Sequence, residues 1–166
     1  MNLVLDINQF NINDVHYQEA VKNTIMDNSK FIRIIYSNSL FMLNGIFIRF
    51  ILNISHVEKS FNKYKCFIDR HTINNTNNEI IAIGKIEREL LEKVTIKGKN
   101  PVYRINEQIM NGHIKIFIDN GNKLSTNEFI LKISGICENE TDYGVTYRFS
   151  DDRVATTTQV PTVNHL

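Results

Sequence analysis

The residues best suited to chemistry lie in one short segment in which lysines alternate with aromatic side chains. This candidate site consists of Lys59, Phe61, Lys63, Tyr64 and Lys65, followed by Arg70 and His71. Lysine and arginine neutralise phosphates, and aromatic faces accept stacked bases, each stack contributing about 1 to 3 kcal/mol. The segment therefore predicts a site for single-stranded DNA or RNA. The competing interpretation is that Phe61 and Phe67 face the core while the lysines solvate a strand edge. The patch is larger if the fold also brings close Lys97, Lys99, Arg104 and Lys115.

A second candidate is the run Asp69-Arg70-His71, where an acid, a base and a histidine are adjacent. In a strand, Asp69 and His71 share a face, so the carboxylate could orient the imidazole for proton transfer. No nucleophile is identifiable beside them, and the sequence has no G-x-S-x-G, P-loop or G-x-G-x-x-G motif. A surface ion pair is the better interpretation, and we expect a non-enzymatic binding protein without a small-molecule cofactor.

Neither the histidines nor the cysteines have the spacing of a metal site. The 5 His are scattered, without an H-x-H or H-E-x-x-H pair, and Cys66 and Cys137 stand far apart inside apolar runs. We expect two buried, reduced thiols, with a disulfide between them as the alternative. The first residues show no basic and apolar leader, so the sequence predicts an intracellular protein.

Composition limits the class of protein. The chain has 166 residues, of which 42% are hydrophobic, enough for one globular domain, which we expect over residues 1–150 before a polar tail over 151–166. The net charge of +1 means that any electrostatic footprint for nucleic acid must be a local patch. The longest apolar stretch, 40–54, is too short and too polar to cross a bilayer, so no membrane partner is expected.

An Asn-Gly pair predicts a β-hairpin. Asn44-Gly45 lies between two apolar runs, and this dipeptide supplies the two positive-φ residues of a type I′ turn. Both faces of such a ribbon are apolar, so one face should be core and the other covered by a helix, the tail or another subunit. The residues that oppose each other near the turn, and so the expected contact residues, are Phe41, Met42, Phe47 and Ile48.

Apolar residues at spacings of three and four predict two helices. Asp14 caps the first, which runs to Met26, and Asn78 caps the second, which carries an aliphatic stripe from Ile80 to Val94. Because the stripe is entirely aliphatic, we interpret it as core rather than as a cofactor site.

Runs of β-branched and aromatic residues predict the strands. These are 3–7, 31–43 with a break near residue 38, 46–50, 63–69, 113–118, 128–137 and 143–149. The last two form a hairpin in which Ser134-Gly135 permits a bulge or a close backbone approach. Residues 106–110 fit a short helix or a hairpin arm.

The element order predicts a β-rich α+β fold. Three strands, a helix and two long strands follow one another as in an OB-type barrel. We therefore expect an OB-like antiparallel barrel or a curled sheet, with an N-terminal helix and one helix between strands 3 and 4.

The closing hairpin carries a resemblance. Ile133-Ser134-Gly135-Ile136-Cys137-Glu138 followed by Tyr143-Gly144-Val145-Thr146-Tyr147-Arg148-Phe149 resembles the closing hairpin of small, mostly uncharacterised proteins of large nucleocytoplasmic DNA viruses. Where such proteins tend to have Trp, this chain has Cys137. The resemblance implies a viral origin, with the host cytoplasm or the virion as location, and implies no activity.

Two functions are compatible with these features. The first is single-stranded nucleic-acid binding through the basic and aromatic segment that ends at His71. The alternative is a structural or assembly protein, such as a virion or complex component. It would contact a second copy or a protein partner through the apolar hairpin and the tail. The strand order favours the first, and the near-neutral charge favours the second.

Overall fold

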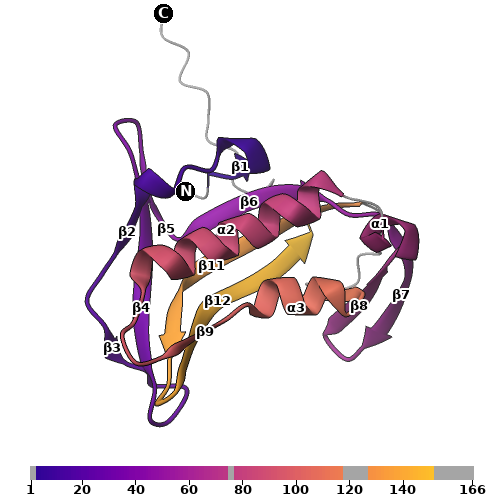
Figure 1. Ribbon diagram of the computed structural model, residues 1–166. Coiled ribbons are helices and arrows are strands. Elements are labelled where there is room, and N and C mark those ends of the chain that lie inside the picture. The colour runs from indigo at the N-terminus through magenta and orange to yellow at the C-terminus, as the bar shows by residue number, and fades with distance from the viewer. Residues whose placement is uncertain (1–2, 75–76, 118–126, 152–166) are drawn as a thin grey trace, which may run out of the picture.

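The computed structural model describes residues 3–74, 77–117 and 127–151, about half of which belong to one large mixed β-sheet (Figure 1). The strands are β1 (Leu5–Asp6), β2 (Val15–Tyr17), β3 (Val21–Lys22), β4 (Lys30–Ser37), β5 (Met42–Asn44), β6 (Ile46–Ile51), β7 (Ile54–Ser60), β8 (Lys63–Ile68), β9 (Asn100–Val102), β10 (His113–Phe117), β11 (Glu128–Glu138) and β12 (Asp142–Asp151). The helices are α1 (Arg70–Asn74), α2 (Asn78–Val94) and α3 (Arg104–Met110), with the 3-10 turns η1 (Ile7–Gln9) and η2 (Ile12–Asp14).

The sheet is open. Its strands follow the order β1-β6-β11-β12-β10-β8-β7, and within the described residues the two end strands do not pair with each other. Strand β1 is parallel to β6, and both β9 and β10 are parallel to β12. The predicted β-rich α+β class is confirmed. The OB-like antiparallel barrel is not, because the sheet does not close and three of its pairings are parallel.

Strand β11 lies in the middle of the sheet. Its first half pairs with β6, its second half pairs with β4, and its other edge pairs with β12 along the whole strand. A register shift between Ile133 and Gly135 marks a β-bulge, as the Ser134-Gly135 pair predicts. A Cβ atom on Gly135 would lie 2.3 Å from the carbonyl oxygen of Ile32, so only glycine fits there.

Helices α2 and α3 lie across one face of the sheet (Figure 1). The aliphatic stripe of α2 packs into the core, which confirms the predicted helix, although Asn77 rather than Asn78 caps it by accepting a hydrogen bond from the Glu79 N–H. Residues 106–110, left open by the sequence, belong to α3. None of the described helices is long and apolar enough to span a bilayer.

The hairpin predicted at Asn44-Gly45 is wrong. Strand β5 pairs with β4, whereas β6 pairs with β11, so the chain leaves one neighbour and joins another at Gly45. Gly45 has a φ of 103°, but Asn44 is not among the described residues with positive φ, and a type I′ turn needs both. Pairing of the apolar β6 with the buried β11 outweighs the local turn preference.

The observed hairpin joins β4 to β5, where the sequence predicted one bent strand. The Asn38 side-chain oxygen accepts hydrogen bonds from the N–H groups of Leu40 and Phe41, so this asparagine makes the turn.

The predicted contact residues therefore do not form an apolar ribbon. Ile48 is fully buried in the core, and the Phe41 ring stacks on Tyr36 with the centroids 6.2 Å apart. Phe47 is half-buried, and Met42 alone of the predicted set is largely exposed, at 72%.

The predicted N-terminal helix from Asp14 to Met26 is also wrong. This segment forms η2, β2 and β3 instead, and β2 and β3 line the edge of β4. Val15 is completely buried opposite Tyr36, so tertiary pairing decides the conformation here rather than helix propensity. Of the predicted tail, 151–166, only Asp151 lies within the described residues, as the end of β12.

Candidate nucleic-acid interface

The sheet face turned away from α2 and α3 carries most of the sheet's basic side chains. Successive residues of a strand point to opposite faces, and the registers show which side chains share this face, called here the outer face. Its basic and aromatic members include Phe31, Arg33, Phe47, Arg49, His56, Lys63, Lys65, Phe67, His113, Lys115, Phe117, Lys132 and Arg148, and its acidic members include Asp6, Glu58 and Glu128. Within β7, β8 and β10, Glu58 is the one acidic residue.

Four aromatic rings of the outer face each lie under a cation. The cation-to-centroid distances are 4.8 Å for Lys63 and Phe117, 4.9 Å for Lys65 and Phe67, 5.4 Å for Lys132 and Phe47, and 5.9 Å for Arg33 and Phe31. Two of the pairs join different strands, Lys63 with Phe117 and Lys132 with Phe47, whereas each of the other two lies within one strand. Together they place positive charge and flat apolar surface side by side along the sheet, the combination that single-stranded nucleic acid requires.

The electrostatics of this face are visible at His113, which lies between two lysines. Burial lowers the pKa of His113, and the charges of Lys65 and Lys115 lower it further. The imidazole of His56 stacks on Phe67 with the centroids 4.2 Å apart. The charges of Lys65 and Lys115 therefore disfavour additional positive charge at His113.

The residues predicted from the Lys-aromatic segment do not all reach one surface. Lys63 and Lys65 point to the outer face, whereas Lys59 and Tyr64 lie on the opposite face, with the lysine nitrogen 5.8 Å from the ring centroid. Phe61 sits in the turn between β7 and β8 and is 98% exposed. The competing interpretation, that Phe61 and Phe67 face the core, is therefore wrong for both rings.

Arg70 and His71 belong to α1 rather than to a strand. The Asp69 carboxylate accepts a hydrogen bond from the His71 N–H at 3.1 Å, so it begins the helix and does not orient the imidazole. Of the residues proposed to extend the patch, Lys115 joins the outer face. Lys99 instead pairs with Glu138, and Arg104 lines a cleft beside the β3–β4 loop.

Several outer-face residues escaped the sequence reasoning. They include Lys132 and Arg148, which lie opposite each other on β11 and β12. Phe47, which the sequence predicted only as a contact residue of the hairpin, lies opposite Lys132 on β6. Alternation of polar and apolar residues within each strand was the available signal. It could not say which strands are neighbours.

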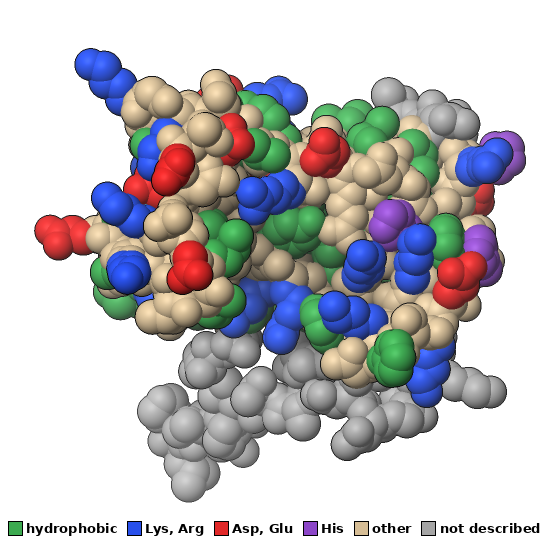
Figure 2. All heavy atoms as spheres, turned by 90° about the horizontal axis from the view of Figure 1, so that it is seen from below, with side chains coloured by type: hydrophobic (Ala, Val, Ile, Leu, Met, Phe, Trp, Pro, Cys, Tyr) green, Lys and Arg blue, Asp and Glu red, His purple; other side chains and the backbone are tan. Residues whose placement is uncertain are grey.

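A cleft of about 700 Å³ lies between the β3–β4 loop and the outer face of β11 and β12. Its lining residues are Val21, Lys22, Asn23, Thr24, Ile25, Met26, Phe31, Arg33, Arg104, Ser134, Cys137, Val145, Thr146 and Tyr147. Figure 2 views the molecule from the end where this loop lies. Hydrophobic side chains lie in the hollow in the middle of the view, and Lys and Arg side chains lie on several sides of it.

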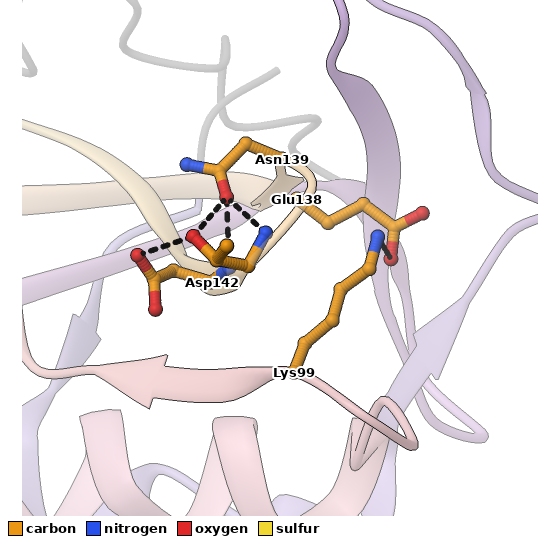
Figure 3. A network of polar contacts seen from close by, with 5 residues as sticks. Lys99, Glu138, Asn139 and Asp142 are labelled. Atoms are coloured by element: carbon orange, nitrogen blue, oxygen red, sulfur yellow. Dashed lines mark hydrogen bonds and ion pairs between the residues drawn. The ribbon is translucent and has the colours of Figure 1, made fainter.

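The turn between β11 and β12 is fixed by a polar network (Figure 3). The Asn139 side-chain oxygen accepts hydrogen bonds from the N–H groups of Thr141 and Asp142, at 2.9 and 2.7 Å. Nearby, the Lys99 ammonium lies 3.5 Å from the Glu138 carboxylate, which ties this end of β11 to the segment before β9. The network holds the register of the two strands that form one wall of the cleft.

The two thiols differ in accessibility. Both cysteines are free, Cys66 is buried and Cys137 is half-buried, so the expectation of two buried thiols holds only for Cys66. Burial raises the pKa of the Cys66 thiol to about 12. Over the described ranges, no group of three His, Cys, Asp or Glu residues lies close enough to hold a metal ion.

No family model matches the chain, and neither a curated protein nor a solved structure matches it.

Proposed function

We propose that this protein binds single-stranded nucleic acid on the outer face of its sheet. The observation that carries the proposal is the row of aromatic rings, each with a Lys or Arg above it, on one face of a chain whose net charge is only +1. Phosphates would draw the cations away from the rings, and bases would take their place on the ring faces.

The strongest part of this surface is formed by β8 and β10. Lys65 lies opposite Lys115, and Lys63 lies opposite Phe117, so cations and rings alternate across the two strands. This spacing suits a flexible strand, whose phosphates and bases can separate to reach both kinds of side chain. Contact through phosphates and stacking implies little sequence preference.

The test is fluorescence anisotropy with a labelled oligo-dT and a labelled oligo-U at several salt concentrations. We expect affinity that falls as salt rises. Lys65→Ala should weaken binding about threefold to tenfold and reduce the salt slope by about one. Phe117→Leu keeps an apolar side chain but removes the ring, and should weaken binding about fivefold.

Lys85→Ala is the matched control, because Lys85 is an exposed lysine of α2 on the other side of the sheet. It should bind as the wild type does. An absence of binding at low salt would end the proposal, as would equal losses in Lys65→Ala and Lys85→Ala. The assembly alternative rested on an apolar ribbon and on the tail. The ribbon does not form, because Ile48 and Phe41 pack inward. The tail beyond Asp151 lies outside the described residues.

A further inference from the structure

The cleft beside the β3–β4 loop combines cations with an apolar floor. Lys22, Arg33 and Arg104 are its charged residues, and none of the described residues that line it is acidic. A cavity of about 700 Å³ lies within the usual size range of small-ligand sites. The balance of charge favours an anionic occupant.

Arg33 and Arg104 both line the cleft and have guanidinium groups available to a ligand there. Arg33 donates one hydrogen bond to the Asn44 side-chain oxygen at 3.0 Å, which leaves further guanidinium N–H groups for an anion. Arg104 lies over β12 at Gly144, where an added Cβ would come 3.7 Å from its Nε. The Tyr147 hydroxyl donates a hydrogen bond to the Gln108 side-chain oxygen at 2.5 Å and lies 3.3 Å from the Arg104 carbonyl oxygen, which holds α3 against β12.

The apolar wall lies on β3, the β3–β4 loop and β4. Ile25 is 90% exposed, and Val21 and Met26 are at least half exposed, although all three line the cleft. Exposed aliphatic side chains around a concave surface mark a place where a ligand removes apolar area from water. On β4, Phe31 adds an aromatic ring to this wall.

The cleft is continuous with the outer face. Arg33 belongs to both, and on β12 the cleft residue Thr146 is two positions from Arg148, so their side chains share one side of the strand. A strand bound along the outer face could therefore reach the cleft without leaving the sheet.

We propose that the cleft binds one nucleotide of the bound strand. Arg33 and Arg104 hold its phosphate, and its base lies against Met26 and Phe31. This inference rests on the proposed function and adds a defined subsite to it. Bound in this way, the nucleotide would also cover the half-buried Cys137, whose sulfur accepts a hydrogen bond from the Asn23 side chain.

The experiment uses Cys137 as a reporter. Adenosine monophosphate is added at increasing concentration to the full chain, and the rate of alkylation of Cys137 by a maleimide is measured by mass spectrometry. Cys66 is buried and serves as the internal reference. We expect the nucleotide to slow alkylation of Cys137 in the wild type and in Arg88→Gln, a control on the exposed side of α2.

Two variants test the cleft itself. Arg104→Gln removes one cation and should abolish the protection and weaken oligo-dT binding about tenfold. Thr146→Phe places a ring on an exposed strand position at the cleft and should have the same two effects. Because Thr146 is exposed, this variant remains informative if Arg104→Gln does not fold.

The outcomes separate the inference from the proposed function. If the wild type binds oligo-dT, but adenosine monophosphate gives no protection and Arg104→Gln binds as Arg88→Gln does, the cleft inference is overturned and the function stands. If the wild type binds no oligonucleotide at low salt, both are overturned, whatever the labelling shows.

Discussion

Glu87 is a carboxylate without exposed surface, placed where α2 meets the start of α3. Its two oxygens accept hydrogen bonds from the N–H groups of Ile105 and Asn106, each at 2.9 Å. The residue before α3, Tyr103, makes no side-chain cap. Glu87 of α2 instead accepts the hydrogen bonds from the first N–H groups of α3. Burial raises the pKa of Glu87, and the backbone hydrogen bonds oppose that rise.

Replacing Glu87 should therefore destabilise the fold. Glu87→Ala leaves the N–H groups of the buried Ile105 and of Asn106 without their acceptor and should lower the free energy of unfolding by about 2 to 4 kcal/mol. Urea denaturation measures this loss. The control is Glu92→Ala, an exposed position of the same helix, which should lie within about 0.5 kcal/mol of the wild type. A loss below about 1 kcal/mol in Glu87→Ala would show that the buried bonds contribute little.

His113 reports on the outer face. In the free protein, the pKa of His113 lies below its ordinary value because of burial and of the charges on Lys65 and Lys115. A phosphate bound between the two lysines offsets their repulsion, so the pKa of His113 should rise on binding. By linkage, affinity should then increase as the pH falls through the range in which His113 takes up its proton.

The measurement is an NMR titration of the imidazole signals with and without oligo-dT. His71, which belongs to α1 rather than to the outer face, is the internal control. An unchanged His113 titration in the presence of bound oligonucleotide would place the phosphates elsewhere.

At the scale of elements, the bulge in β11 sets how β4 approaches it. An added Cβ at Gly135 would lie 2.3 Å from the Ile32 carbonyl oxygen and 2.5 Å from the Phe31 ring. The β4 backbone cannot move away from the added Cβ atom without loss of its pairing with β11. Gly135→Ala should therefore lower the free energy of unfolding by about 2 to 4 kcal/mol in urea denaturation.

Gly98→Ala is the comparison for this variant. Gly98 has a φ of 80° and nothing within 4 Å of an added Cβ, so the substitution strains the backbone without a steric clash. It should destabilise by about 1 kcal/mol. Equal losses in the two variants would contradict a steric origin for the effect of Gly135→Ala.

The elements that the sequence predicted well are those whose signals are local. A few consecutive residues are enough to identify these patterns. They are the aliphatic period of α2, the alternation in β8 and β10, and the long β11–β12 hairpin. The turn at Asn44-Gly45 was misread because β5 and β6 each find a better partner further along the chain. Strand β7 was missed because its residues are largely polar and exposed.

In the site, too, local patterns predicted some residues, whereas pairing between distant strands determined the others. Alternation placed Lys63 and Lys65 together, but their neighbour Lys115 and the more distant Lys132 and Arg148 join them only through strand register. Register between distant strands depends on burial of the whole sheet, which no local window contains. The cleft has the same origin, since its walls come from segments more than 100 residues apart, such as Ile25 and Tyr147.

At the scale of the whole molecule, the central position of β11 has a consequence for synthesis on the ribosome. Strands β4 and β6 both pair with β11, and β9 and β10 pair with β12, yet β11 and β12 emerge after all four. The apolar residues of β4 and β6 therefore lack β11, their partner strand, while most of the chain is translated. Such distant pairing predicts slow folding and a nascent chain that depends on chaperones until residue 138 has left the exit tunnel.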